Sequence, residues 1–211
     1  MARTTAIKIG IDQITAMADQ VGQLDAQVFS KAAQDALNET ADRTYDLASD
    51  RITTGINLSD DYLRRRMTVE HASGSKLEAS ITATGSRAMM TRLATYDAAM
   101  VIVPRKTTRA SRTKGVLPLN GGRQAGVSVT VTRGATKMGK DMFMLPLRTG
   151  AVLGEKFGVF RREGKKLKHL FGPSVYQLFA YQAPRMAGDV ADDLQQTLLD
   201  KVEVQVDRIF K

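Results

Sequence analysis

Residues 168–180 read KHLFGPSVYQLFA, an apolar stretch that a Gly-Pro pair interrupts. Proline fits the first position of a helix, because the N–H that it lacks would have no helical partner there. The segment VYQLFA that follows places its apolar side chains on one helical face. We therefore expect a structural joint, at which the chain leaves a sheet and enters a helix, at Gly172, Pro173 and Ser174.

Three segments before this joint are predicted strands. VSVTVTR (127–133), DMFMLPLR (141–148) and KFGVFRR (156–162) are separated by glycine-containing turns, so we expect one antiparallel sheet with the new helix packed on it. A second helix is predicted from about residue 189, after Pro184, because a single apolar stripe comprises Val190, Leu194, Leu198, Val202, Val206 and Ile209. The VEVQV part of that segment also fits a strand.

The N-terminal quarter of the chain is predicted to be mostly one long helix. Alternating isoleucines in TAIKIGI (5–11) first indicate a short strand. Apolar residues from Ile14 to Val28 then recur at spacings of 3, 4, 3 and 4, which predicts a helix that begins after Asp12 and ends near Gly55. A helix of this length would extend about 60 Å at about 1.5 Å per residue. That is longer than one compact domain needs, so we expect it to pack against a neighbour.

The middle of the chain completes an α+β fold. LSDDYLRRRM (58–67) begins with acidic residues and ends with arginines. This charge order stabilises a helix through its dipole, so we predict a short helix here. MTVEHAS and KLEASITAT indicate a hairpin, and AAMVIVP (98–104) a further strand. We expect an N-terminal arm and long helix over 1–57 and an α+β core over 58–211, in one folding unit, with C-terminal helices packed on an antiparallel sheet.

The net charge of +9 is concentrated in one segment. Residues 1–97 hold 11 basic and 13 acidic side chains, and residues 141–211 hold 11 and 9. Between Asp97 and Asp141 there are nine basic residues and no acidic one. The net charge of this segment, +9, therefore equals the net charge of the whole chain. The segment is also rich in Gly, Thr and Ser without an apolar face, so we predict a long mobile basic loop over about 104–125.

This predicted loop has two functional interpretations and one structural one. Its bases could neutralise DNA phosphates without reading sequence, or could bind an acidic partner, or could simply be solvated. Residues 104–140 contain no aromatic side chain, so base stacking is not expected. The residues predicted to contact DNA or a partner are Arg105, Lys106, Arg109, Arg112, Lys114 and Arg123.

Signals of catalysis are weak throughout the sequence. The absence of cysteine excludes thiolate zinc sites and cysteine nucleophiles, and the two histidines have no metal-ligand spacing. GATKMGKD (134–141) begins like a phosphate-binding loop, but Asp141 stands where Ser or Thr should bind magnesium, and a strand follows instead of a helix. A hydrolase that uses Ser174 and His169 ranks last, because no nucleophile-elbow pattern surrounds the serine. We predict no enzyme, no cofactor and no metal site.

Nothing in the sequence indicates a membrane or a secretion signal. No run of about 18 apolar residues occurs, and MARTTAIKIGIDQ at the N-terminus has no long apolar segment or small-residue cleavage site. We therefore expect a protein made in the cytoplasm without a membrane partner.

The order of several motifs resembles one known family. GVSV (126–129), FRR (160–162) and GPSV (172–175) follow a long N-terminal helix and LSDDYLRRRM, an arrangement similar to the minor tail protein Z family, the tail completion proteins of long-tailed bacteriophages. The similarity covers about residues 12–205. Each motif alone is weak, and their order and spacing carry the match. The basic segment at 104–124 matches least well.

The resemblance implies a non-enzymatic virion protein that completes the head-proximal end of a tail, at the head-tail junction. The implied neighbours are the tail terminator, the tail tube, the tape measure protein, connector proteins and the genomic DNA in the channel. We expect a homo-oligomer, as a ring or a few copies, assembled in the host cytoplasm. The alternative is a free cytoplasmic protein that binds nucleic acid without sequence specificity.

Overall fold

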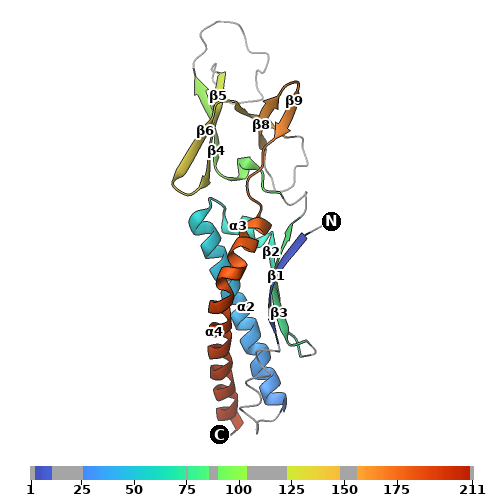
Figure 1. Ribbon diagram of the computed structural model, residues 1–211. Helices are drawn as coiled ribbons and strands as arrows, with labels where there is room; N and C mark the ends of the chain where they lie inside the picture. The colour runs from blue at the N-terminus through green and yellow to red at the C-terminus, as the bar shows by residue number, and fades with distance from the viewer. Residues whose placement is uncertain are drawn as a thin grey trace. The chain divides into compact units, whose positions relative to one another are not determined.

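The computed structural model describes residues 3–10, 26–74, 76–85, 90–103, 123–147 and 156–209. The fold is α+β, as predicted. It has two compact units (Figure 1). Unit 1 comprises Met1–Ile52, Asp60–Met89 and Val175–Lys211, and unit 2 comprises Thr53–Ser59 and Met90–Ser174.

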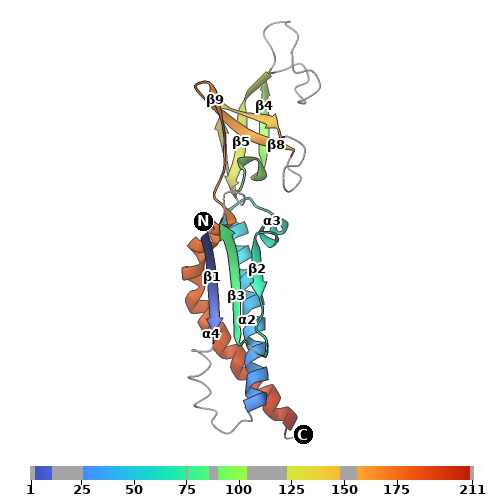
Figure 2. The ribbon, with the colours of Figure 1, turned by 90° about the vertical axis from the view of Figure 1, so that its right-hand side faces the viewer.

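Unit 1 packs two long helices on one face of a small sheet (Figure 2). The sheet has the order β1-β3-β2 and antiparallel pairing, with β1 at Arg3–Gly10, β2 at Met67–Glu70 and β3 at Glu78–Gly85. The helices are α2, Ala26–Gly55, and α4, Val175–Ile209, and a short helix α3, Asp60–Arg64, precedes β2. This confirms the predicted helix end at Gly55, the short helix and the hairpin of β2 and β3. The first part of the predicted long helix, residues 12–25, lies outside the described residues.

The core of unit 1 is lined by one face of each element. Small side chains on α2 and alternate residues of β3 are fully buried, together with a stripe along α4. These buried residues include Ala33, Leu37, Ala79, Ile81, Phe179, Met186, Leu194 and Leu198. Polar bonds at the edge of the core join α2 to the segment before β3, where Asn38 accepts from the backbone N–H of Ala72 at 2.7 Å.

A network of ion pairs connects the exposed sides of α2 and α4. Arg43 donates to Glu39 at 2.5 Å and to Asp193 at 2.8 Å, and Lys201 contacts Glu39 at 2.6 Å. The hydrogen bond from Lys201 and then that from Arg43 lower the pKa of the Glu39 carboxyl below its ordinary value. Arg51 contacts Asp189 at 2.7 Å. The long N-terminal helix therefore has α4 as a neighbour within its own unit.

Two predictions about the C-terminal helix are wrong. The segment forms one continuous helix through Pro184, including VEVQV, rather than two helices. Proline removes one backbone hydrogen bond, but the buried stripe continues on both sides of it through Phe179 and Met186. The helix also starts at Val175 and not at Pro173. Within unit 1 it packs on β1 and β3.

Unit 2 contains two three-stranded antiparallel sheets. One has the order β4-β5-β6, with β4 at Ala98–Val103, β5 at Arg123–Thr132 and β6 at Ala135–Gly139. The other has the order β7-β8-β9, with β7 at Met142–Pro146, β8 at Phe157–Glu163 and β9 at Lys166–His169. A one-turn 3-10 helix, η2, spans Leu93–Thr95.

The predicted single sheet of three strands is therefore wrong. Its strands are divided between two sheets, and β6 and β9 were not predicted, because ATKMG and KLKH lack an apolar alternation. The expectation of a loop to residue 125 is also wrong at its end, because β5 begins at Arg123. Residues 104–122 lie outside the described residues.

Side-chain and backbone bonds hold unit 2 together. The side-chain amide of Gln124 in β5 makes two hydrogen bonds to the backbone of Met144 in β7. Its Nε2 donates to the Met144 carbonyl at 3.1 Å, and its Oε1 accepts from the Met144 N–H at 2.9 Å. Three side chains of this unit are fully buried: Val127 of β5, Val159 of β8, and Tyr96, which follows η2. The segment after α2 joins the same unit, since Asn57 donates its N–H to the Val131 carbonyl at 2.8 Å.

Among the helices in the described part of the chain, none is both long enough and apolar enough to span a membrane. The described residues also contain no group of three or more His, Asp or Glu side chains arranged to hold a metal ion.

Candidate polyanion-binding surface

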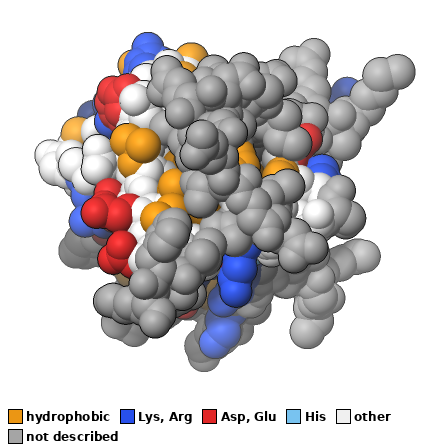
Figure 3. Space-filling view, turned by 90° about the horizontal axis from the view of Figure 1, so that it is seen from below, with side chains coloured by type: hydrophobic (Ala, Val, Ile, Leu, Met, Phe, Trp, Pro, Cys, Tyr) orange, Lys and Arg blue, Asp and Glu red, His pale blue; other side chains and the backbone are white. Residues whose placement is uncertain are grey.

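The two units differ strongly in charge. Unit 2 holds 17 basic and 4 acidic residues, a net charge of +13, whereas unit 1 holds 14 and 18, a net charge of −4. Acidic side chains lie beside hydrophobic ones on the face seen from below in Figure 3. The net excess of positive charge therefore lies in unit 2.

A basic hairpin of β8 and β9 extends beyond the third strand of its sheet. The last pair between β7 and β8 joins Met142 to Arg161, whereas β8 and β9 remain paired as far as Glu163 and Lys166. Gly164 and Lys165 make the two-residue turn, and φ of +61° at Gly164 suits glycine at the first turn position. Residues 162–168 are all exposed, so this end is a two-stranded ribbon in solvent.

The ribbon carries more basic than acidic side chains. We call the segment 161–168, RREGKKLK, the basic hairpin; it has five bases and one acid, a net charge of +4. Glu163 lies 3.5 Å from Arg161 and 3.2 Å from Lys168. The ion pairs of the hairpin within the described residues involve only these two bases and not Arg162, Lys165 or Lys166.

An aromatic ladder supports the root of the hairpin. Phe143, Phe160 and His169 are direct cross-strand partners on β7, β8 and β9, with ring centroids 6.5 Å and 4.5 Å apart. The ring of Phe171 follows at 4.6 Å from His169. Gly158 provides room for this stack, since a Cβ there would lie 2.7 Å from Nε2 of His169. The ladder fixes the direction of the hairpin, because such cross-strand aromatic pairs stabilise register.

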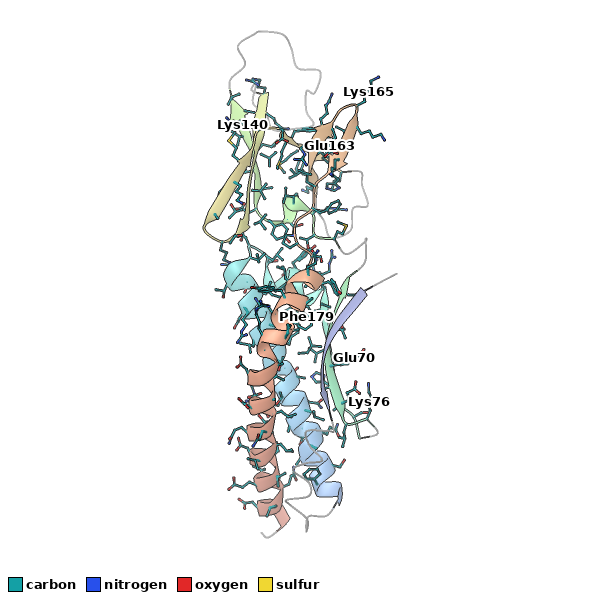
Figure 4. The ribbon with its side chains drawn as sticks, viewed as in Figure 1. Glu70, Lys76, Lys140, Glu163, Lys165 and Phe179 are labelled. Carbon is teal, nitrogen blue, oxygen red and sulfur yellow. The ribbon has the colours of Figure 1, made fainter. Side chains whose placement is uncertain are left out.

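Other bases lie at the same end of unit 2. Lys140 follows β6, and its neighbour Asp141 contacts Arg161 at 3.7 Å, which brings the β6–β7 turn next to the hairpin. Figure 4 shows Lys140, Glu163 and Lys165 at one end of this unit. Arg123 pairs with Val103 at the same end of the β4–β5 pair.

The structure describes the position of only one residue of the predicted contact set. Arg123 is exposed at the first position of β5. The other predicted contact residues lie outside the described residues: Arg105, Lys106, Arg109, Arg112 and Lys114. The basic hairpin was missed because its charge was averaged over 141–211, where α4 contributes six acids. A shorter window over RREGKKLK would have identified it.

The rejected phosphate-binding loop is indeed a different structure. Its residues form β6 and the turn after it, and the segment that follows is the strand β7 rather than a helix. The helix N-terminus that would bind phosphate in such a motif is absent at this described position.

Two residues of the predicted joint, Gly172 and Pro173, are bonded to the segment of unit 2 around η2. Gly172 donates its N–H to the Thr91 carbonyl at 2.9 Å, and the hydroxyl of the buried Tyr96 donates to the carbonyl of Pro173. A Cβ on Gly172 would lie 3.0 Å from Cζ of Tyr96 and closer still to Cε2. The boundary between the two units falls directly after Ser174.

Comparison with known proteins gives one match. Residues 10–208 match the model of a family described as prophage minor tail protein Z (GPZ). The search of curated proteins found no match, and neither did the search of solved structures. The matched range covers both units almost completely.

Proposed function

Because the chain belongs to the prophage minor tail protein Z family, we propose that it is a structural virion protein that completes the head-proximal end of a phage tail. Membership of this family makes it a phage tail protein, and the proposal adds its place at the head-tail junction and its non-enzymatic character. The observation that carries the proposal is the family match over residues 10–208, nearly the whole chain.

The charge distribution supports a specific arrangement within the particle. Unit 2, with a net charge of +13, faces DNA in the channel or an acidic protein partner. The basic segment at 104–122 and Arg123 take part in this contact. Unit 1 supplies helices whose exposed apolar side chains, Leu199 and Val204, face neighbouring subunits. The protein assembles in the host cytoplasm as a ring or in a few copies.

Expected neighbours follow from this location. They are the tail terminator, the tail tube, the tape measure protein and connector proteins. In a closed ring every subunit makes the same contacts with its neighbours, so the number of copies equals the rotational symmetry of the ring. The copy number per particle would therefore indicate the symmetry.

Quantitative mass spectrometry of purified particles tests the proposal. We expect a few copies of the chain per particle, measured against tail tube and connector proteins, and crosslinks to proteins of the head-proximal end. Absence from particles, or crosslinks only to the distal tip, would refute it.

The net charge of unit 2 also favours a second candidate, a free cytoplasmic protein that binds nucleic acid without sequence specificity. This candidate predicts the chain in the soluble fraction of a lysate, bound to nucleic acid, and none in purified particles. The same mass spectrometry therefore separates the two.

A further inference from the structure

We propose that the basic hairpin of β8 and β9 is a DNA-binding ribbon that contacts the phosphates of duplex DNA without reading its sequence. The inference deepens the proposed function, because it selects DNA over an acidic protein and assigns the contact to a described element. It rests on the shape of the hairpin, its charge and the side-chain types that it exposes.

The hairpin presents bases in several directions. Directly paired residues of antiparallel strands point to the same face, so the pairs Arg161–Lys168 and Glu163–Lys166 share one face. Arg162 points to the opposite face, and Lys165 lies in the turn at the tip. A ribbon with cations on both faces and at its tip matches a partner with negative charge on two sides.

Duplex DNA has this arrangement of charge. Its major groove is bordered by two phosphate backbones, and it is wide enough to admit a two-stranded β-ribbon. The part of the hairpin beyond Arg161 is such a ribbon, since β7 pairs no further than that residue. Residues 162–168 are all exposed, so no element of unit 2 has to move before DNA can reach them.

The charges of the hairpin are available to phosphates. Its single carboxylate, Glu163, is already near Arg161 and Lys168. Arg162, Lys165 and Lys166 have no ion pair with any other described residue of the hairpin or its surroundings. These three bases can each replace a condensed counterion on DNA without first leaving a carboxylate of the described residues.

The composition of the hairpin favours DNA over a protein partner. Cores of protein–protein interfaces are depleted in lysine and are formed by aromatic or other large apolar side chains. Segment 161–168 has one apolar side chain, Leu167, which is half exposed, and three lysines. It also has no aromatic residue on which an unpaired base would stack, so duplex rather than single-stranded DNA is the expected ligand.

The aromatic ladder makes the ribbon a prepared site. The stacked rings of Phe143, Phe160 and His169 hold β8 and β9 in register directly below the basic residues. A ribbon fixed in direction before binding loses less conformational entropy when it contacts DNA.

The test measures binding of full-length protein to labelled duplexes of two unrelated sequences, over roughly 50 to 200 mM NaCl. One variant neutralises the hairpin by Arg162→Gln, Lys165→Gln and Lys166→Gln. The matched control neutralises three other exposed bases of unit 2 by Arg133→Gln, Lys137→Gln and Lys156→Gln. Both variants lower the net charge of the unit by three and change only exposed side chains.

We expect equal affinity for both DNA sequences and a linear fall of log K with log[NaCl]. Each lost phosphate contact reduces the magnitude of the slope of log K against log[NaCl] by about 0.9. This magnitude should therefore fall by about 2.7 in the hairpin variant and by much less in the control variant. The single variant Lys165→Gln, at the turn, should lose about 0.9. Circular dichroism that matches wild type will show that the variants are folded.

Three results would overturn the proposal: no DNA binding by the wild-type chain, equal losses in the hairpin and control variants, or binding to poly-L-glutamate without binding to DNA. Each leaves the proposed tail function standing if the chain is present in particles. Conversely, absence of the chain from particles would refute the tail function. It would leave the DNA-binding proposal standing if the slope change is specific to the hairpin variant.

Discussion

Replacing Gly172 with alanine should destabilise unit 2, because the residue packs directly on a buried ring. The new methyl group would lie 3.0 Å from Cζ and 3.2 Å from Cδ2 of Tyr96, and closer still to Cε2. Tyr96 is fully buried and its hydroxyl donates to the Pro173 carbonyl, so the ring cannot move away without loss of that bond.

The expected magnitude follows from this crowding. Adding a methyl group to a well-packed core costs about 1–3 kcal/mol. Loss of the tyrosine hydrogen bond would add about 1 kcal/mol if the ring shifts. For a chain of this size, 1 kcal/mol lowers Tm by about 2–4 °C, so we expect a decrease of several degrees.

Gly188→Ala is the matched control for this substitution. Gly188 is exposed within α4, and apart from its chain neighbours and the backbone of its own helix a Cβ there would meet nothing within 4 Å. Glycine in a helix interior is less favourable than alanine by about 0.5–1 kcal/mol, so this variant should be more stable than wild type. The same chemical change is thus expected to have opposite signs at the two positions.

Differential scanning calorimetry and urea unfolding of both variants provide the measurement. A Gly172→Ala protein that melts at or above the wild-type temperature would show that residue 172 is not crowded by Tyr96 and would refute this reasoning. A decrease in Gly188→Ala of similar size would attribute the effect to loss of glycine itself instead.

Further predictions concern unit 1. Phe179→Ala should cost about 3–5 kcal/mol because this ring (labelled in Figure 4) is fully buried, whereas Leu199→Ala, at a half-exposed position, should cost far less; urea unfolding compares the two. Arg43→Ala should cost no more than about 1 kcal/mol because its ion pairs are exposed, and high salt should reduce the difference from wild type. The pKa of Glu39 is lowered by Lys201 and Arg43, so its contribution to stability should be present above the ordinary pKa of 4.5 and be lost as the pH falls through the lower folded value. Glu39→Gln should therefore differ from wild type in a melt at neutral pH and converge with it in acid.

Much of the fold could be predicted from the sequence because its signals are local. Apolar spacing identified the helix that ends at Gly55, and a charge order identified the short helix at Asp60–Arg64. Alternation identified β3 and the centre of β5, and an apolar run closed by proline identified β4. The strand pairs in the described part of the chain are antiparallel. In each case the residues that carry the signal are close together in the chain.

The errors arose where a local rule competed with packing. Pro184 predicted a break, but burial of Phe179 on one side and Met186 on the other keeps α4 continuous. β6 and β9 have mostly exposed side chains, so no periodicity marks them, and their backbone pairing with β5 and β8 defines them as strands.

The candidate site shows the same division. The sequence alone determined that the protein is basic, has no cysteine and resembles a tail protein family, because composition and motif order need no coordinates. Only the tertiary structure assigned the charges to units of −4 and +13, since unit 1 collects segments from both ends of the chain and the linear count over 141–211 combined the acids of α4 with the bases of the hairpin. It also showed that the pairing of β7 with β8 ends at the pair Met142–Arg161, while β8 and β9 remain paired to Glu163 and Lys166, which leaves the basic residues on a two-stranded ribbon. Strand length and pairing depend on contacts between distant residues, so a linear sequence does not determine them.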